Sequence, residues 1–278
     1  MPLHHLLILA LIQGITEFLP VSSSGHLVLV HTGLNGDPAS DWQRERMLDV
    51  AVHIGTLIAV LIYFRRDIYA MLGYIWRIDS GDGDNFGRRL LVSIVVASLP
   101  VILAGFALYI IQPAWLRSLE LVAWTTLGFG IVLWFCDRYA PGDKALSGLT
   151  WRSALIIGAA QALALIPGTS RSGITMSAAR ALGFARTESA RFSLLLAIVA
   201  ISGAGVVTGM DVITNGNPAL GIDMGLAALM AAIAGWLAIA LLMRWLARAS
   251  FTPFVIYRIV LGGGLLALIY SGYLPASL

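Results

Sequence analysis

The sequence contains a single cysteine, Cys136, among its 278 residues. One cysteine excludes a disulfide within the chain and a metal cluster built on cysteine ligands. Charge is also scarce: Asp, Glu, Lys and Arg make up 12% of the chain, whereas a soluble domain contains about 25%. A soluble globular protein is therefore excluded, and no nucleic-acid partner is expected.

The chain is instead dominated by apolar residues, which make up 58% of it at a mean hydropathy of +0.84. Six apolar stretches are long enough to cross about 30 Å of hydrocarbon. They lie at Leu48–Phe64, Leu90–Ile111, Leu119–Phe135, Phe192–Met210, Met224–Leu246 and Pro253–Leu274. No Lys or Arg precedes the first apolar residues, so a cleavable signal peptide is not expected. The pattern predicts an all-α integral membrane protein.

Two polar motifs interrupt this apolar sequence. The first runs from Gln13 to His26 and the second from Gln161 to Gly173. In both, a Gln stands twelve residues before a Gly, with a Pro and a Ser/Thr cluster between them, and the copies are 148 residues apart. Polar side chains at membrane depth are costly unless they have a function. We therefore expect the two motifs to form the functional site.

Each motif predicts a short helix, a break and a second short helix. The expected boundaries are Leu3–Leu19, Pro20–Gly25 and His26–Leu34 in the first copy, and Ser153–Ile166, Pro167–Gly173 and Ile174–Leu182 in the second. At a rise of 1.5 Å per residue such helices are too short to cross the membrane. Broken backbone is tolerated at this depth only inside protein or beside water. Both segments are therefore predicted to be re-entrant hairpins.

The distribution of positive charge predicts the orientation. Thirteen Lys and Arg residues fall on one side, in the loops around 65–89, 138–152, 180–191 and 244–248, and only three fall on the other. The rich side is assigned to the cytoplasm. Six spans then place the first hairpin outside and the second inside, so that the halves, approximately 1–140 and 150–278, form an inverted-topology repeat within a single membrane domain. In such repeats, half-helix N-termini converge on an anionic group near the bilayer middle.

The residue types in both breaks suit a phosphate group. Ser and Thr cap helix N-termini, whose free N–H groups attract anions, and Gly allows the backbone to approach a ligand closely. Arg171 provides a planar cation for bidentate contact with phosphate. The expected substrate-binding residues are Ser22, Ser24, Gly25, Gly168, Thr169, Ser170, Arg171 and Ser172.

The first motif also contains the residues needed for catalysis. A hydroxyl near an imidazole, as in Ser23 and His26, is a candidate nucleophile and base, and Glu17 would orient the base or hold a metal. Gln13 lies four residues before Glu17, on the same helix face, so the two could share Mg²⁺ or Ca²⁺. The predicted catalytic residues are Glu17, Ser23, His26 and Arg171, and the predicted metal ligands are Gln13 and Glu17.

A purely structural interpretation explains any one of these residues. Serines in membrane helices often serve packing, and Glu17 with Arg171 could form a structural ion pair between the halves. This structural interpretation does not explain why all of these residues fall in two matching breaks.

The two motifs resemble those of a known family. E-F-L-P-V-S-S-S-G-H at Glu17–His26 and P-G-T-S-R-S-G at Pro167–Gly173 are similar to the signatures of the bacterial undecaprenyl-diphosphate phosphatases, or bacitracin-resistance proteins. Segments beginning at Leu48, Arg191 and Ser250 also resemble this family. The resemblance implies an enzyme of the bacterial inner membrane that removes the terminal phosphate of undecaprenyl diphosphate. Its product is the lipid carrier for peptidoglycan and other envelope polymers.

The resemblance also implies roles for individual residues. The family's Glu/Gln-x-x-x-Glu pair falls on Gln13 and Glu17, its Ser and His on Ser23 and His26, and its Arg on Arg171. Gln at position 13 removes one negative ligand and makes metal binding there weaker or indirect. The family's chemistry is placed on the outer face, which agrees with a first hairpin that enters from outside.

Several alternatives stay open at this point. Inverted repeats with a central anion site are typical of secondary transporters, so a transporter or flippase of a lipid phosphate is the alternative function, and a non-catalytic lipid-binding scaffold is a third. The nucleophile could be Ser23, His26 or water. The small residues of Ala227–Ala234 allow helix association either within the chain or in a homodimer.

Overall fold

The computed structural model describes residues 3–34, 42–76, 86–111, 116, 118–140, 142–215 and 221–276. Within these ranges the chain is built of helices and contains no β-strand. The first half comprises α1 (Leu3–Thr16), α2 (Ser23–Leu34), α3 (Trp42–Tyr63), α4 (Arg65–Trp76), α5 (Phe86–Ile111) and α6 (Leu119–Tyr139). The second comprises α7 (Trp151–Ala162), the 3₁₀ turn η3 (Leu163–Leu165), α8 (Arg171–Ala181), α9 (Arg186–Asn215), α10 (Gly221–Leu246) and α11 (Thr252–Tyr270).

Several of these helices are suited to a bilayer. By length and composition four can cross a membrane, namely α5, α6, α10 and α11, and α3 with α4 makes a fifth if this pair, bent by 78°, is one broken span. Large apolar side chains face outward on them: Leu103, Leu241 and Val260 are 69%, 67% and 68% exposed. Outward-facing apolar surface of this kind fits lipid rather than water. The protein is therefore an all-α, multi-pass membrane protein.

Each of the six predicted apolar stretches falls largely or entirely within a helix, but two loop predictions were wrong. The segment after Phe64 was expected to be a loop, yet it forms α4, an amphipathic helix with Arg65 at its start. The segment 211–223, which lies between two of the predicted spans, was also expected to be a loop, but α9 continues to Asn215 and α10 begins at Gly221. At Arg65 the chain bends and a new helix begins, whereas at residue 211 the helix α9 simply continues. Polar residues therefore mark the end of the apolar stretch in both places, while helical structure goes on beyond it. The stretch Asp79–Asp84, which falls in the loop expected at 65–89 and is predicted to be a flexible turn, lies outside the described residues.

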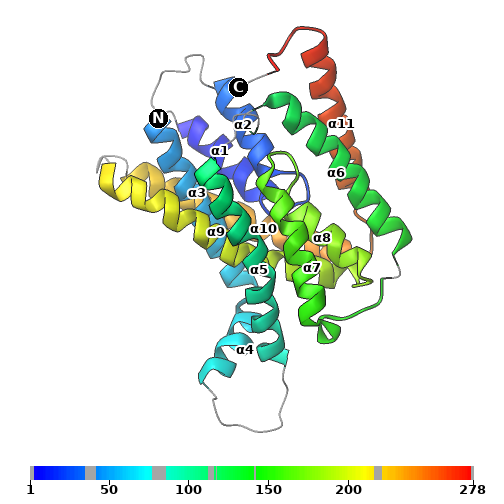
Figure 1. Ribbon diagram of the computed structural model, residues 1–278. Coiled ribbons are helices and arrows are strands. Elements are labelled where there is room, and N and C mark those ends of the chain that lie inside the picture. Colours follow the sequence, from blue (N-terminus) through cyan, green and yellow to red (C-terminus); the bar gives the residue numbers. More distant parts are fainter. Residues whose placement is uncertain are drawn as a thin grey trace.

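Each motif forms the expected short helix, break and second short helix, and the first helix of each packs on the opposite half. Helix α1 lies against α10, and α7 lies against α5. Glycine permits both contacts: a Cβ at Gly14 would lie 2.6 Å from the Ala234 Cβ, and one at Gly158 would lie 2.3 Å from the Ala97 carbonyl oxygen. Figure 1 also shows α6 and α11 side by side at one edge of the molecule. Each half thus contacts the other through the first helix of its broken motif.

The small residues of α10 serve this packing within the chain. Ala227 and Ala231 are fully buried in a cluster with residues of α1 and α3. Of the two uses left open for this stretch, association within the chain is the one that the structure shows.

Two buried aspartates on the positive side form ion pairs that join helices. Asp137 of α6 accepts a hydrogen bond from Arg180 Nε of α8 at 3.1 Å and one from Arg186 Nε of α9 at 2.7 Å. Asp67 of α4 pairs with Arg191 of α9. Breaking such a pair is strongly destabilising, because one charge would be left buried without a partner. They fix α8 and α9 at this end of the molecule, while the polar breaks lie at the other end of α8.

Candidate active site

The two breaks end in the same backbone geometry. Ser22 and Ser170, which are 148 residues apart, both have positive φ angles, of 76° and 71°. A non-glycine residue in this left-handed region is strained, and such strain is found where the surrounding structure enforces it. The Oγ of Ser22 accepts from the Gly25 N–H at 3.4 Å, and the Oγ of Ser170 accepts from the Gly173 N–H at 3.1 Å.

The predicted helix caps are thereby confirmed at Ser22 and Ser170. A second serine accompanies each one: the Oγ atoms of Ser22 and Ser24 are 3.3 Å apart, and those of Ser170 and Ser172 are 3.2 Å apart. The helices α2 and α8 begin at Ser23 and Arg171, somewhat earlier than expected. Two hydroxyls therefore lie at the N-terminus of each helix, where an anion is favoured.

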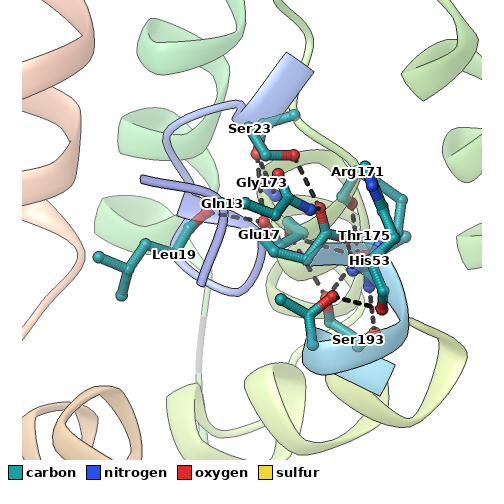
Figure 2. A network of polar contacts seen from close by, with 12 residues as sticks. Gln13, Glu17, Leu19, Ser23, His53, Arg171, Gly173, Thr175 and Ser193 are labelled. Carbon is teal, nitrogen blue, oxygen red and sulfur yellow. Dashed lines mark hydrogen bonds and ion pairs between the residues drawn. The ribbon is translucent and has the colours of Figure 1, made fainter. Parts of the chain in front are cut away.

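The carboxylate of Glu17 is the centre of the polar network in Figure 2. One oxygen, Oε1, accepts from Arg171 Nη2 at 2.9 Å. The other, Oε2, accepts from Ser23 Oγ at 2.8 Å and from Gln13 Nε2 at 3.0 Å. The Glu17 side chain is 9% exposed and that of Arg171 14%. Four of the predicted residues, from both motifs, are therefore in direct contact.

The guanidinium of Arg171 is held from a second side as well. Its Nη1 donates to the Ser193 carbonyl oxygen of α9 at 2.9 Å. The Ser193 hydroxyl in turn lies 2.7 Å from the Thr175 hydroxyl. The planar fork of the arginine is thus oriented by two acceptors at once, which lysine could not reproduce.

His26 has other partners than Ser23. Its Nδ1 is 2.7 Å from the Ser22 carbonyl oxygen, and its Nε2 contacts the Tyr257 hydroxyl of α11. A carbonyl can only accept, so Nδ1 carries a proton, and in the neutral ring Nε2 accepts from Tyr257. The expected contacts of His26 with Ser23 and Glu17 are therefore not formed. Ser23 donates to Glu17 instead, because Glu17 faces the start of α2.

Comparison with known proteins shows the family to which the chain belongs. The family model described as bacitracin resistance protein BacA matches residues 6–264. The chain belongs to the BacA family. It is 46% identical to an undecaprenyl-diphosphatase of Ruegeria pomeroyi over 275 residues, covering 98% of this chain and 100% of the relative. It is also 46% identical to undecaprenyl-diphosphatase 1 of Rhodospirillum rubrum over 278 residues, covering 98% and 97%.

One arginine of this BacA-family protein joins both breaks and was not predicted. Arg258 of α11 is fully buried. Its guanidinium donates to the carbonyl oxygens of Pro20 in the first break, at 3.3 Å, and of Gly168 and Thr169 in the second, at 3.1 and 2.9 Å. Its Nε donates to the Thr126 carbonyl oxygen at 2.9 Å. An arginine in the middle of an apolar stretch was the sequence signal for it, since such a residue marks a functional site by default.

Sequence reasoning also missed three further residues around the BacA site. Tyr257 contacts His26, Ser193 holds Arg171, and His53 of α3 lies beside Glu17 (Figure 2). Tyr257 and Ser193 belong to segments whose resemblance to the family was recognised without roles for single residues. Their spacing from the two motifs contains no signal, because only the fold brings α3, α9 and α11 to the breaks.

The proposed metal ligands offer a partial oxygen site. Gln13 Oε1 is buried and has no hydrogen-bond partner within the described residues. Both Glu17 oxygens already accept hydrogen bonds, and the described residues contain no cluster of three or more His, Cys, Asp or Glu side chains. Mg²⁺ commonly binds through one or two carboxylates together with water and substrate phosphates. The donor set fits an ion of this kind, completed by a diphosphate, and does not form a closed protein cage.

Proposed function

We infer that this protein is an undecaprenyl-diphosphatase, which hydrolyses undecaprenyl diphosphate to undecaprenyl phosphate and inorganic phosphate. The observation that carries this conclusion is the direct contact of Ser23 and Arg171 with Glu17, because it unites a nucleophile, its base and a phosphate-binding cation. The relatives at 46% identity are named for this activity.

The substrate diphosphate would lie at the N-termini of α2 and α8. Arg171, the capping serines and the free N–H groups would bind its phosphoryl oxygens and stabilise the charge that spreads over them in the transition state. Arg171 can turn one side of its fork from Glu17 to phosphate while Ser193 still holds the other. The exposed apolar faces leave the isoprenoid tail in lipid.

The chemical step has two forms that the site supports. In one, Ser23 Oγ bonds to the terminal phosphorus, Glu17 accepts the serine proton, and the bridging P–O bond breaks to release undecaprenyl phosphate; water then cleaves the seryl phosphate. In the other, Ser23 and Glu17 position water, which attacks the terminal phosphorus directly. In both, the buried Glu17 carboxylate is the proton acceptor, and His26 is available for later proton transfer.

Gln13 and Glu17 would hold a divalent cation, Mg²⁺ or Ca²⁺, together with the diphosphate. When bound, such an ion neutralises charge on the phosphate oxygens. Glu17 is the only carboxylate of this pair, so binding of the ion in the absence of substrate should be weak.

The finer architecture belongs to the same proposal. We place six spans and two re-entrant hairpins in an inverted repeat in the bacterial inner membrane, with the site open to the outer face. The matching φ angles of Ser22 and Ser170, and the reciprocal packing of α1 on α10 and α7 on α5, support the repeat. The orientation is supported by the excess of Lys and Arg on one side. A homodimer is not needed to complete this site.

The test is phosphate release from undecaprenyl diphosphate by purified protein in detergent, with and without EDTA. Ser23→Ala should lose activity, whereas Ser98→Ala, a buried serine of α5 that bonds only to its own helix, should keep it. Release that EDTA abolishes would support the cation. Well-folded protein that binds the lipid diphosphate but releases no phosphate would overturn the proposal and favour a transporter.

A further inference from the structure

A cavity outside the candidate active site opens at the positive end of the molecule. It lies between the start of α5 and the start of α7, which run against each other (Figure 1). Its volume is about 270 Å³, and it is lined by Arg88, Arg89, Val92, Ser93 and Trp151. Two cations, an indole and a buried hydroxyl-bearing residue therefore surround one space.

The arginines at this cavity contact an aromatic ring and a carbonyl oxygen, and not a carboxylate of the described residues. The guanidinium of Arg88 lies 5.7 Å from the ring centre of Tyr74, and that of Arg89 donates to the Ser147 carbonyl oxygen. A further arginine, Arg152, is not part of the lining, and its guanidinium lies 5.3 Å from the ring centre of Trp151. In the described part of the chain no Asp or Glu forms a salt bridge with any of the three. Two guanidinium groups at one cavity suit an anion such as phosphate.

Apolar surface continues from the cavity along both helices. On α5, Val95 and Leu99 share the face of Arg88 and Val92, being seven and eleven residues beyond Arg88, and they are 52% and 50% exposed. On α7, Leu155 lies one turn after Trp151 and is 42% exposed. A charged pocket followed by outward-facing apolar side chains matches the headgroup and acyl chains of one molecule.

We propose that this cavity binds the headgroup of an anionic phospholipid from the cytoplasmic leaflet. The guanidinium groups of Arg88 and Arg89 contact the phosphodiester, and the acyl chains lie along Val95, Leu99 and Leu155. Basic pockets between transmembrane helices on the cytoplasmic side are suited to such headgroups. A free anion would use the cations but not the apolar surface, so the observations favour a lipid.

Such a lipid would stabilise the position of the second hairpin. Helix α7 leads into the break that carries Arg171, and it rests on α5 through the close contact of Gly158 with Ala97. A lipid that contacts both helices at their charged ends adds to this packing. Bound anionic phospholipid should therefore raise the thermal stability of the protein.

The experiment is native mass spectrometry of the full chain released from nanodiscs that contain phosphatidylglycerol and phosphatidylcholine. The wild type should retain phosphatidylglycerol. Replacing Arg88 and Arg89 together by Gln should reduce retention at least about tenfold, because charge-assisted hydrogen bonds to the phosphate are lost. Replacing Arg65 and Arg66 by Gln is the matched control, since it removes the same charge from the same side and should leave retention unchanged. Equal losses of phosphatidylglycerol in the two double variants would show that retention depends on general electrostatic attraction to the surface. That result would overturn the proposed binding site.

A second variant leaves every charge in place. Val92→Trp fills the cavity and should also abolish retention, whereas Val260→Trp, on the lipid-facing side of α11, should not. Displacement of the phospholipid by millimolar inorganic phosphate would show that the cavity takes a free anion and would contradict the lipid assignment. None of these measurements uses phosphatase activity, so the lipid site and the proposed function can fail separately.

Discussion

Ser23 and Arg171 occupy equivalent positions in the two breaks, 148 residues apart, and both donate a hydrogen bond to the same carboxylate, that of Glu17. The repeat thus places two different side chains at one structural position, a hydroxyl in the first half and a cation in the second. Because each bonds to a different oxygen of Glu17, the acid can accept a proton from one while it orients the other. The two copies of the motif therefore have chemically different side chains at this equivalent position.

Glu17→Gln removes the proton acceptor while it keeps the size of the side chain. We expect turnover to fall by about 10²–10⁴, the usual contribution of general base catalysis. Ser23 would lose its strongest acceptor, and the charge of Arg171 would be unpaired. The measurement is phosphate release under saturating lipid diphosphate, with thermal unfolding to verify the fold. Glu120→Gln, at the hydrogen bond to Tyr270, should remain close to wild type; equal activity in the two variants would refute the base assignment.

Arg171→Lys keeps the charge but loses the planar fork that reaches Glu17 and the Ser193 carbonyl together. We expect kcat/KM to fall about 10²–10³-fold, comparable to the loss of one donor that stabilises transition-state charge. Steady-state kinetics of the purified variant measure this effect. A lysine variant with kcat/KM within threefold of wild type would show that only the charge matters and that the two-sided geometry does not.

The sequence was sufficient to predict four of the site residues that lie within the motifs. Gln13, Glu17, Ser23 and Arg171 meet as expected, because two Gly/Pro-broken motifs at membrane depth have few other structural solutions. The role of His26 was predicted wrongly in its contacts. Proximity along the chain suggested Ser23 and Glu17 as its partners, but the left-handed Ser22 turns the start of α2 so that the ring reaches Tyr257 instead.

The supporting residues could not be predicted because they depend on packing between distant helices. Arg258 reaches Pro20 across 238 residues of sequence and Gly168 across 90. No periodicity in α11 distinguishes this contact from an ion pair with a carboxylate elsewhere. The α4 helix was missed for a local reason: its paired arginines, Arg65 and Arg66, indicate the end of an apolar stretch, while the backbone bends at Phe64 and continues as a helix.

Arg258 should act as a positioning residue for both breaks. Arg258→Lys retains a cation but can reach fewer of the carbonyl oxygens of Pro20, Gly168 and Thr169. We expect kcat to fall at least about tenfold with little change in KM, because the N-termini that hold the phosphate shift relative to each other. Arg180→Lys is the matched control, an equally buried arginine whose acceptors lie at the opposite end of α8. If both variants lose stability and kcat in parallel, Arg258 has only a structural role.

Tyr257→Phe tests whether the second contact of His26 matters. The variant keeps the ring, which stacks on the imidazole at 5.6 Å between centroids, and removes only the hydroxyl that donates to Nε2. Without this donor the imidazole remains attached to the Ser22 carbonyl alone and can rotate away. We expect kcat to fall about tenfold, in the lower part of the range for a misplaced proton-transfer group, while KM changes little.

Tyr270→Phe supplies the comparison for that measurement, because it removes a hydrogen-bonded hydroxyl from the same helix, at the contact with Glu120. Its kcat should equal that of the wild type. The two variants should also differ in the dependence of kcat on pH, since only Tyr257 contacts a titrating ring. If Tyr257→Phe leaves both kcat and its pH profile unchanged, His26 takes no part in proton transfer, and Glu17 performs that role alone.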